Sequence, residues 1–464
     1  MSDRIIRFGG SYIGYIDSVR SLIDYLQKKP GRTFVVVSAI PELLEWIEQN
    51  LEQIFNSQPA TEELNEKLVS FFTDRVGKKQ TTNFQYLSEQ LVNLLKGIAL
   101  IGDFSPALKD QVVTFAEKLS IEILLAQLKR TGSEPRAISP EELGLIATSD
   151  FGNATFVSVN NAFISSLPES VYLVPGSYGI TENGKVVRTG KTAADYTAAF
   201  LTAQLNTQKL ELWGLDLDFY KADPKIVKNP PLIERLTYSE ASELAYFDHY
   251  SFHPRTVEPL EHRHIPIQVL NTLANPGKVD TIINTETFVD DKIVKSVACS
   301  DDISLLKLDG PGVGLKPGIL ARVTTALNDA GINIKSVITS QISINLILER
   351  ATGEKALKLI QKLGFTSVKE IHLVKDVSLI GVIGHGMQQN YGVSAKIFTA
   401  VAQNKINVVL SGSGASDLVS YLVVKSSDKE KSVKVIYDAF FKEPLLPSPD
   451  GRNKNSIKVN KGFN

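Results

Sequence analysis

The N-terminal part of the chain combines short apolar runs with an amphipathic stretch. Residues 5–8 form an apolar run that is interrupted by Arg7 and that ends in Gly9-Gly10. Residues 14–29 place apolar side chains three and four positions apart, which predicts a helix. Residues 33–39 form a mainly β-branched run, which is typical of a strand buried on both faces. A strand, a glycine turn, a helix and a second strand together predict a parallel α/β sheet.

The helical period of apolar residues dominates residues 41–130. Strand-like runs return between residues 143 and 215, and one helix is predicted among them over 195–205. The run HIPIQV at 264–269 is predicted to be the last strand of this region. Residues 272–302 contain only short apolar runs separated by polar residues, which is typical of a segment that joins two domains.

An internal repeat marks the C-terminal part of the chain. Residues 310–333 and 384–407 share eight identities in 24 aligned positions, including glycines ahead of a helical pattern and an Ile-Asn pair after it. Each copy is predicted to form a strand, a helix, two strands and a second helix, so two βαββαβ modules are expected. Residues 446–464 are rich in Asn, Lys, Gly and Pro, and they are predicted to be a disordered tail.

Charge and composition exclude several classes of protein. The 464 residues contain 50 Lys+Arg and 51 Asp+Glu, so no global positive field attracts nucleic acid. A single cysteine, Cys299, can form neither an internal disulfide nor a zinc site of several cysteines. No run approaches 18 consecutive apolar residues, and the N-terminus lacks the apolar stretch of a signal peptide. A soluble cytoplasmic protein without a membrane or nucleic-acid partner is therefore predicted.

Several short motifs occur in the order and spacing found in the aspartate kinases of the amino acid kinase family. Residues 7–12, Arg-Phe-Gly-Gly-Ser-Tyr, resemble the opening block Lys-Phe-Gly-Gly-Thr-Ser, and residues 35–39 match the block Val-Val-Val-Ser-Ala. Gly102-Asp103 is matched to a Gly-Glu block. Further similar blocks lie at 151–154, 174–176, 195–199, 238–247, 253–254 and 265–267. The C-terminal repeat resembles the paired ACT regulatory domains of the same enzymes.

This resemblance covers about residues 5–445 and implies the fold. We expect an α/β protein in which an amino acid kinase-like three-layer sandwich with a mostly parallel sheet spans residues 1–272. A connecting segment is expected at 273–302, followed by two ferredoxin-like βαββαβ ACT modules at 303–375 and 376–445. The resemblance also implies a homodimer that binds an amino-acid effector at its ACT modules.

The function implied by the resemblance is phosphorylation of the side-chain carboxylate of L-aspartate by ATP with Mg²⁺. This transfer brings two anions together, so it needs a cation near the migrating phosphoryl group and backbone N–H donors for the phosphates. The resemblance assigns catalysis to Arg7 and Asp195, and substrate binding to Ser38, Asp103 and Lys191. The residues that it assigns to the nucleotide are Gly9, Gly10, Ser11, Trp213, Gly214, Tyr220 and Asp223. Those that it assigns to the effector are Gly318, Ile319, Leu320, Asn333 and Thr339.

The chain departs from the family at several of these motifs. Arg7 replaces a lysine, and Asp103 replaces a glutamate. Residues 190–195, Gly-Lys-Thr-Ala-Ala-Asp, replace Gly-Arg-Gly-Gly-Ser-Asp, in which the arginine grips the α-carboxylate of the amino acid. The sign of each charge is kept, whereas the shape of the groups changes. Two alternatives therefore stay open: a catalytically impaired homologue with a regulatory or amino-acid-sensing role, and a kinase of another amino-acid carboxylate.

The first ACT module carries a further departure. Lysine-sensing members of the family place an acid on the strand after the first helix of the module, where it meets the ammonium of the effector. Lys335 stands in this region of the chain. The sequence therefore predicts that lysine does not inhibit the protein by this route.

Overall fold

A computed structural model describes residues 3–28, 31–53, 61–77, 79–132, 134–190, 193–214, 217–247, 252–271, 278–286, 293–314, 316–413 and 416–442. The chain forms two compact units. The first unit comprises Met1–Pro224, Lys228–Phe288 and Ala298–Asp302, and the second comprises Lys225–Val227, Val289–Val297 and Ile303–Asn464. Among the described helices, none is both long enough and apolar enough to cross a bilayer.

An eight-stranded sheet forms the centre of the first unit, in the order β10-β12-β11-β9-β1-β2-β6-β3. The six strands from β11 to β3 run parallel to one another, whereas β12 runs antiparallel to β11. The mostly parallel sheet predicted from the sequence is thus confirmed. The strands are β1 (Arg4–Phe8), β2 (Thr33–Val37), β3 (Arg136–Ala137), β6 (Val171–Pro175), β9 (Leu210–Trp213), β10 (Arg235–Thr237), β11 (Ile267–Leu270) and β12 (Thr281–Asn284).

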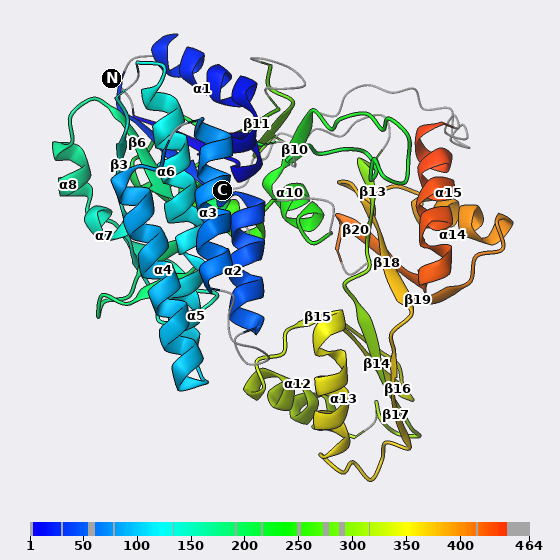
Figure 1. Cartoon of the computed structure of the whole chain (residues 1–464). Helices are drawn as coiled ribbons and strands as arrows, with labels where there is room; N and C mark the ends of the chain where they lie inside the picture. The colour runs from blue at the N-terminus through cyan, green and yellow to red at the C-terminus, as the bar shows by residue number, and fades with distance from the viewer. Residues whose placement is uncertain are drawn as a thin grey trace. The chain divides into compact units, whose positions relative to one another are not determined.

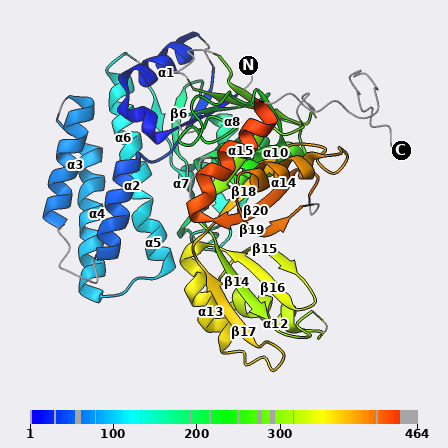
Figure 2. The same cartoon turned by 90° about the vertical axis from the view of Figure 1, so that its right-hand side faces the viewer.

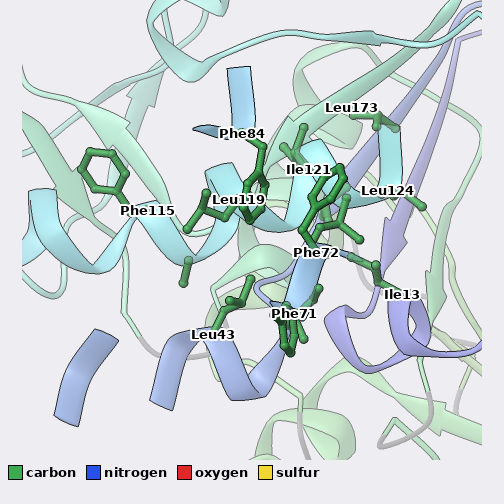
Figure 3. Packing of buried hydrophobic residues seen from close by; sticks show 14 of the residues in the cluster. Ile13, Leu43, Phe71, Phe72, Phe84, Phe115, Leu119, Ile121, Leu124 and Leu173 are labelled. Carbon is green, nitrogen blue, oxygen red and sulfur yellow. The ribbon is translucent and has the colours of Figure 1, made fainter. Parts of the chain in front are cut away.

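A layer of helices covers one face of this sheet, and α3, α4 and α6 lie side by side within it (Figures 1 and 2). Alternate residues of β1 and β2, among them Ile6, Phe8, Val35 and Val37, are buried in one apolar cluster with the residues of this layer. Figure 3 shows aromatic and aliphatic side chains of that cluster interdigitating. The helices are α1 (Ile16–Lys28), α2 (Pro41–Gln53), α3 (Thr61–Val76), α4 (Thr82–Ile101), α5 (Pro106–Val113) and α6 (Phe115–Lys129).

The opposite face of the sheet is covered by α9 (Ala194–Gln204), which contacts β1, β2 and β9. Because side chains alternate along a strand, Arg7 of β1 points to the face opposite Ile6 and Phe8, where it meets Asp195 at the start of α9. Helix α9 is built largely from small and apolar residues and is buried nearly all round. This arrangement forms the third layer, and the helix lies within one residue of its predicted bounds.

A small four-stranded sheet, in the order β5-β4-β7-β8, completes the first unit. Its strands β7 and β8 pair in antiparallel register, so that Tyr178 faces Arg188. The strands are β4 (Ile146–Ala147), β5 (Phe156–Ser158), β7 (Tyr178–Ile180) and β8 (Val186–Arg188). The remaining helices are η1 (Gly10–Gly14), α7 (Pro140–Leu143), α8 (Asn161–Ser166), α10 (Tyr238–Leu244), η2 (Pro254–Thr256) and α11 (Glu258–Glu261).

The second unit contains two four-stranded antiparallel sheets, each with two helices on one side (Figure 1). The first sheet has the order β15-β16-β14-β17. Its chain order is β14 (Ser304–Asp309), α12 (Ile319–Asp329), β15 (Ile334–Thr339), β16 (Ser343–Leu348), η3 (Arg350–Thr352), α13 (Gly353–Gln361) and β17 (Glu370–Val374). This is the βαββαβ order that the repeat predicts.

The second module obtains its fourth strand from an unexpected part of the chain. Its sheet has the order β13-β18-β20-β19, and β13 (Ser296–Ser300) comes from the segment expected to connect two domains. The same segment supplies β12 to the large sheet, so it contributes one strand to each of these two sheets. Residues 443–464, which include the predicted tail, lie outside the described residues. The other elements are β18 (Val377–Ile383), α14 (Val393–Gln403), β19 (Val408–Gly412), β20 (Val419–Lys425), η4 (Ser426–Asp428) and α15 (Lys429–Phe441).

Candidate active site

The glycine turn after β1 opens into a pocket of about 820 Å³, part of which is open to solvent. The pocket combines two guanidinium groups, one carboxylate, three hydroxyl groups and several glycine or alanine backbones. The lining residues are Arg7, Gly9, Gly10, Ser11, Ser38, Ala39, Pro41, Leu44, Val113, Glu117, Ser177, Arg188, Ala193, Ala194, Gly214 and Leu217.

Arg7 and Asp195, both predicted to be catalytic, form a buried ion pair. Arg7 Nε lies 2.7 Å from Asp195 Oδ1, and the side chains are 8% and 0% exposed. Burial raises the pKa of Asp195, whereas the charge of Arg7 and the backbone N–H of His253 act in the opposite direction. That N–H donates to Asp195 Oδ2 at 3.3 Å. Asp195 therefore holds the Arg7 guanidinium in one place at the wall of the pocket.

Added side chains at the glycines around Arg7 would crowd the site. A Cβ on Gly9 would lie 3.0 Å from Arg7 Nη1, and a Cβ on Gly214 would lie 2.8 Å from the same atom. At Gly10 a Cβ would come within 1.8 Å of the carbonyl oxygen of Ala39, so any side chain there would displace backbone. These three predicted residues line the pocket, and they bring its walls close to the guanidinium.

Glu117 is an acid of the pocket that the motif comparison missed. It lies on α6, is 3% exposed, and accepts a hydrogen bond at Oε2 from the backbone N–H of Ser177 at 2.8 Å. Burial raises the pKa of Glu117 to about 6, although the hydrogen bond from Ser177 and the charge of Arg188 act downward. A buried acid with a raised pKa in a cleft is a typical functional group.

Asp103, to which the sequence assigned the acidic role, is not brought to the pocket. It is exposed after the end of α4, and its Oδ1 accepts a hydrogen bond from the backbone N–H of Phe104 at 2.8 Å. A signal for Glu117 was present in the sequence, since the residue shares a helical face with Ser120, Ile121 and Leu124 of α6. An acid on such a face is either paired or functional.

Arg188, at the end of β8, is the second pocket residue that sequence reasoning missed. The sequence offers only a weak signal that Arg188 is functional: an arginine that ends a short strand just before Gly190. Within the described residues, no carboxylate lies close enough to Arg188 to form an ion pair, and its buried Nε atom has no hydrogen-bond partner. The pocket therefore contains one paired and one unpaired guanidinium.

The remaining wall of the pocket offers polar groups to a ligand. The predicted residues Ser11 and Ser38 line it, and Ser38 Oγ is buried with no hydrogen-bond partner among the described residues. Ala193 and Ala194, at the start of α9, line it as well, and no side chain caps this end of the helix. Uncapped N–H groups at a helix N-terminus favour anions.

Three residues predicted to bind the nucleotide do not line the pocket. The Trp213 ring packs edge-on against Tyr25, and its Nε1 donates to Glu211 at 3.3 Å, so only its backbone reaches Arg7. The hydroxyl of Tyr220 donates to Asp218 at 2.9 Å. Asp223 is buried at 9% exposure. Lys191 lies outside the described residues.

The predicted effector residues all belong to the first module of the second unit, and they are Gly318, Ile319, Leu320, Asn333 and Thr339. The first three begin α12, with Gly318 in the left-handed region at φ 90°. In the loop before α12, the N–H of Gly314 donates a hydrogen bond at 3.0 Å to the carbonyl oxygen of Gln341. Gln341 lies in the turn that follows Thr339. Asn333 precedes the opposite end of β15. The structure thus brings Thr339 towards this loop but places Asn333 away from it.

Comparisons with known proteins agree with this architecture. A model of the amino acid kinase family matches residues 4–271, and a model of the ACT domain matches residues 306–363 and 380–440. A bifunctional aspartokinase/homoserine dehydrogenase of Haemophilus influenzae is 27% identical over 465 residues, which cover 94% of this chain and 56% of that protein. Aspartokinase 2, chloroplastic, of Arabidopsis thaliana is 27% identical over 460 residues, which cover 94% of this chain and 84% of that protein.

Solved structures share the fold. The structure of E. coli aspartokinase III in complex with aspartate and ADP superposes with a TM-score of 0.79 at 22% identity, covering 95% of this chain and all of that one. The predicted fold class is therefore confirmed. Since the first family model matches more than half of the 464 residues, the chain belongs to the amino acid kinase family and carries ACT domains in its C-terminal part.

Proposed function

We propose that the protein is an aspartate kinase, which transfers the γ-phosphoryl group of ATP to the side-chain carboxylate of L-aspartate. The observation that carries this proposal is the Arg7–Asp195 ion pair beside the glycine turn, in the same pocket as Glu117. The aspartokinase names of the relatives support the same substrate, and one similar structure holds aspartate and ADP. The charges of Arg7, Asp195 and Glu117, which are brought together at one pocket, favour this reading over a catalytically impaired homologue.

In the proposed reaction, a carboxylate oxygen of aspartate attacks the γ-phosphorus, and the bond from that phosphorus to the bridging oxygen of ADP breaks. Negative charge is present on both reactants, so the fixed guanidinium of Arg7 stabilises the phosphoryl group during transfer. The N–H groups at the start of α9 offer further donors to anionic oxygens. Glu117, charged above pH about 6, attracts the ammonium of the amino acid.

Mg²⁺ bound to ATP is part of this proposal. Among the described residues, no three His, Cys, Asp or Glu side chains cluster as metal ligands. In this proposal the metal would arrive with the nucleotide and keep phosphate oxygens and waters as its main ligands, as Mg²⁺ commonly does. Bound in this way, the ion neutralises phosphate charge.

The domain bounds, the oligomeric state, the effector and the cellular location are proposals as well. We propose domain bounds at 1–272, 303–375 and 376–445, with a connecting segment at 273–302 that adds β12 to the large sheet and β13 to the second ACT sheet. We also propose a homodimer, an amino-acid effector at the first ACT module, and a location in the cytoplasm. The bounds are supported by the spans of the family matches. A single cysteine in 464 residues suits a reducing compartment.

Acyl phosphate formation tests the central proposal directly. The full chain is incubated with Mg-ATP and L-aspartate, and the product is trapped with hydroxylamine. We expect hydroxamate from aspartate in preference to other amino acids. Calorimetry with Mg-ATP provides an independent measurement. Absence of both hydroxamate and nucleotide binding at millimolar ATP would remove the kinase proposal, and a different preferred amino acid would change the substrate.

A further inference from the structure

The two guanidinium groups of the pocket differ in their partners. Arg7 is neutralised by Asp195 at 2.7 Å. Arg188 lines the same pocket but, within the described part of the chain, forms no ion pair, and its buried Nε atom has no hydrogen-bond partner. A buried donor without a partner costs free energy, and the cost is higher for a charged group. A ligand that supplied an anionic acceptor would remove this cost.

The backbone of Arg188 is clamped on both sides. Its N–H donates to Asp110 Oδ2 at 2.9 Å, and its carbonyl accepts from Ala154 N–H at 2.9 Å. The same Asp110 oxygen accepts from Gly152 N–H at 2.7 Å, so one buried carboxylate ties the 151–154 loop to β8. The base of the Arg188 side chain is therefore fixed before any ligand binds. Such preorganisation reduces the entropy lost on binding.

The sheet register places Arg188 near Glu117. Arg188 pairs with Tyr178 across β7 and β8, and the preceding residue, Ser177, donates its N–H to Glu117. The Arg188 charge acts on Glu117, yet the two side chains form no ion pair with each other among the described contacts. Both groups line the pocket. An unpaired cation and a nearby acid match a ligand that carries a carboxylate and an ammonium group on one carbon.

We propose that Arg188 binds the α-carboxylate of the amino-acid substrate, beside the Glu117 carboxylate to which the proposed function already assigns the ammonium group. This inference rests on the function proposed above and adds a specificity residue to it. The guanidinium offers the planar fork that a carboxylate accepts in two parallel hydrogen bonds, which the lysine at position 191 does not offer. Arg188 would thus restore, from a neighbouring strand end, the fork that the 190–195 segment lacks.

Paired ligands test this role. L-aspartate and β-alanine share the reacting carboxylate and the ammonium group, but β-alanine lacks the α-carboxylate. Their dissociation constants are measured by calorimetry for the full-length wild type, Arg188→Gln and Arg188→Lys, and for Arg136→Gln as a matched control on the exposed strand β3. Wild type and control should prefer aspartate by about 10- to 100-fold, the usual range for a charged hydrogen bond. In Arg188→Gln this ratio should fall to about one through weaker aspartate binding alone, and Arg188→Lys should lie between.

The outcomes separate this inference from the proposed function. An unchanged ratio in Arg188→Gln, or an equal loss for both ligands, overturns the role of Arg188 even when wild type forms acyl phosphate. If wild type binds aspartate but forms no acyl phosphate, the kinase function fails, and the binding ratio still decides the role of Arg188. If wild type does not bind aspartate, both proposals are overturned. The Michaelis constant for ATP should stay within about twofold in every variant, because a carboxylate contact is not shared with the nucleotide.

Discussion

The charge of Glu117 should control the pH dependence of substrate binding. Burial raises the pKa of this acid to about 6, so the folded protein holds it as carboxylate at pH 7.5 and mostly as neutral acid at pH 5. Only the carboxylate attracts the substrate ammonium. The Michaelis constant for aspartate should therefore rise as pH falls through 6, and it should be about tenfold higher at pH 5 than at pH 7.5.

Glu117→Gln provides the matching control, since it removes the titration but keeps an acceptor for Ser177 N–H. This variant should show a high Michaelis constant for aspartate at every pH, while that for ATP stays flat. His253 does not interfere, because burial lowers its pKa to about 4 and it stays neutral between pH 5 and 8. Initial rates at varied aspartate between these limits measure the effect. A pH profile that survives in Glu117→Gln would assign the titration to another group.

The Arg7–Asp195 pair should be coupled in stability as well as in activity. Arg7→Met leaves a fully buried carboxylate without its counter-charge, which should cost about 3–5 kcal/mol of unfolding free energy. Adding Asp195→Asn removes the uncompensated charge and keeps an acceptor for His253 N–H, so the double variant should regain most of this loss. Arg7→Met and the double variant should both be inactive, because both lack the cation of Arg7.

Tryptophan fluorescence during urea unfolding measures this effect selectively, because Trp46 and Trp213 are the only tryptophans and both belong to the first unit. The coupling is read from the two single variants and the double variant. A double variant that is no more stable than Arg7→Met would show that the pair does not act as a unit.

The turn that joins β1 to η1 should tolerate no side chain at its second glycine. A Cβ on Gly10 would lie 1.8 Å from the Ala39 carbonyl oxygen, whereas a Cβ on Gly14, in the same short helix, would meet nothing within 4 Å. Gly10→Ala should therefore destabilise the first unit by about 1–3 kcal/mol or more and weaken ATP binding. Gly14→Ala is the matched control and should leave both unchanged. Thermal unfolding and nucleotide calorimetry compare the two, and equal behaviour would contradict this account.

Elements whose residues carry a strong local period could be predicted from the sequence. Strand β2 and helix α9 lie within about two residues of their predicted bounds, because β-branched runs and helical spacing are local properties. Strand β13 could not be predicted in this way. It completes the second ACT sheet from residues that precede the whole first module, and no local pattern specifies such a distant partner as β18.

The residues of the candidate site also divide into those that local sequence motifs predict and those that only contacts between distant segments reveal. Arg7, Gly9, Gly10 and Ser38 were predicted, since they sit in contiguous motifs next to buried strands. The acid of the pocket was assigned to the wrong residue, Asp103, because a short Gly-Asp match at 102–103 was chosen within a long helical region. Both Glu117 and Glu122 of α6 are buried, and the hydrogen bond from Ser177 N–H marks Glu117 as the one that lines the pocket. Tertiary contacts, rather than motif spacing, decide which of several acids reaches a pocket.

Lysine should not act as an effector at the first ACT module. Lys335 lies on β15 and is half-buried, so the side-chain ammonium of lysine bound near this strand would face a like charge, which costs several kcal/mol at close range. Millimolar lysine should therefore change the rate of acyl phosphate formation by less than about twofold. Lys335→Glu reverses this charge and should make the rate more sensitive to lysine, whereas Lys369→Glu, an exposed reversal in the same module, should not. Strong inhibition of the wild type by lysine alone would mean that the ammonium is bound elsewhere, at a site where Lys335 exerts no repulsion.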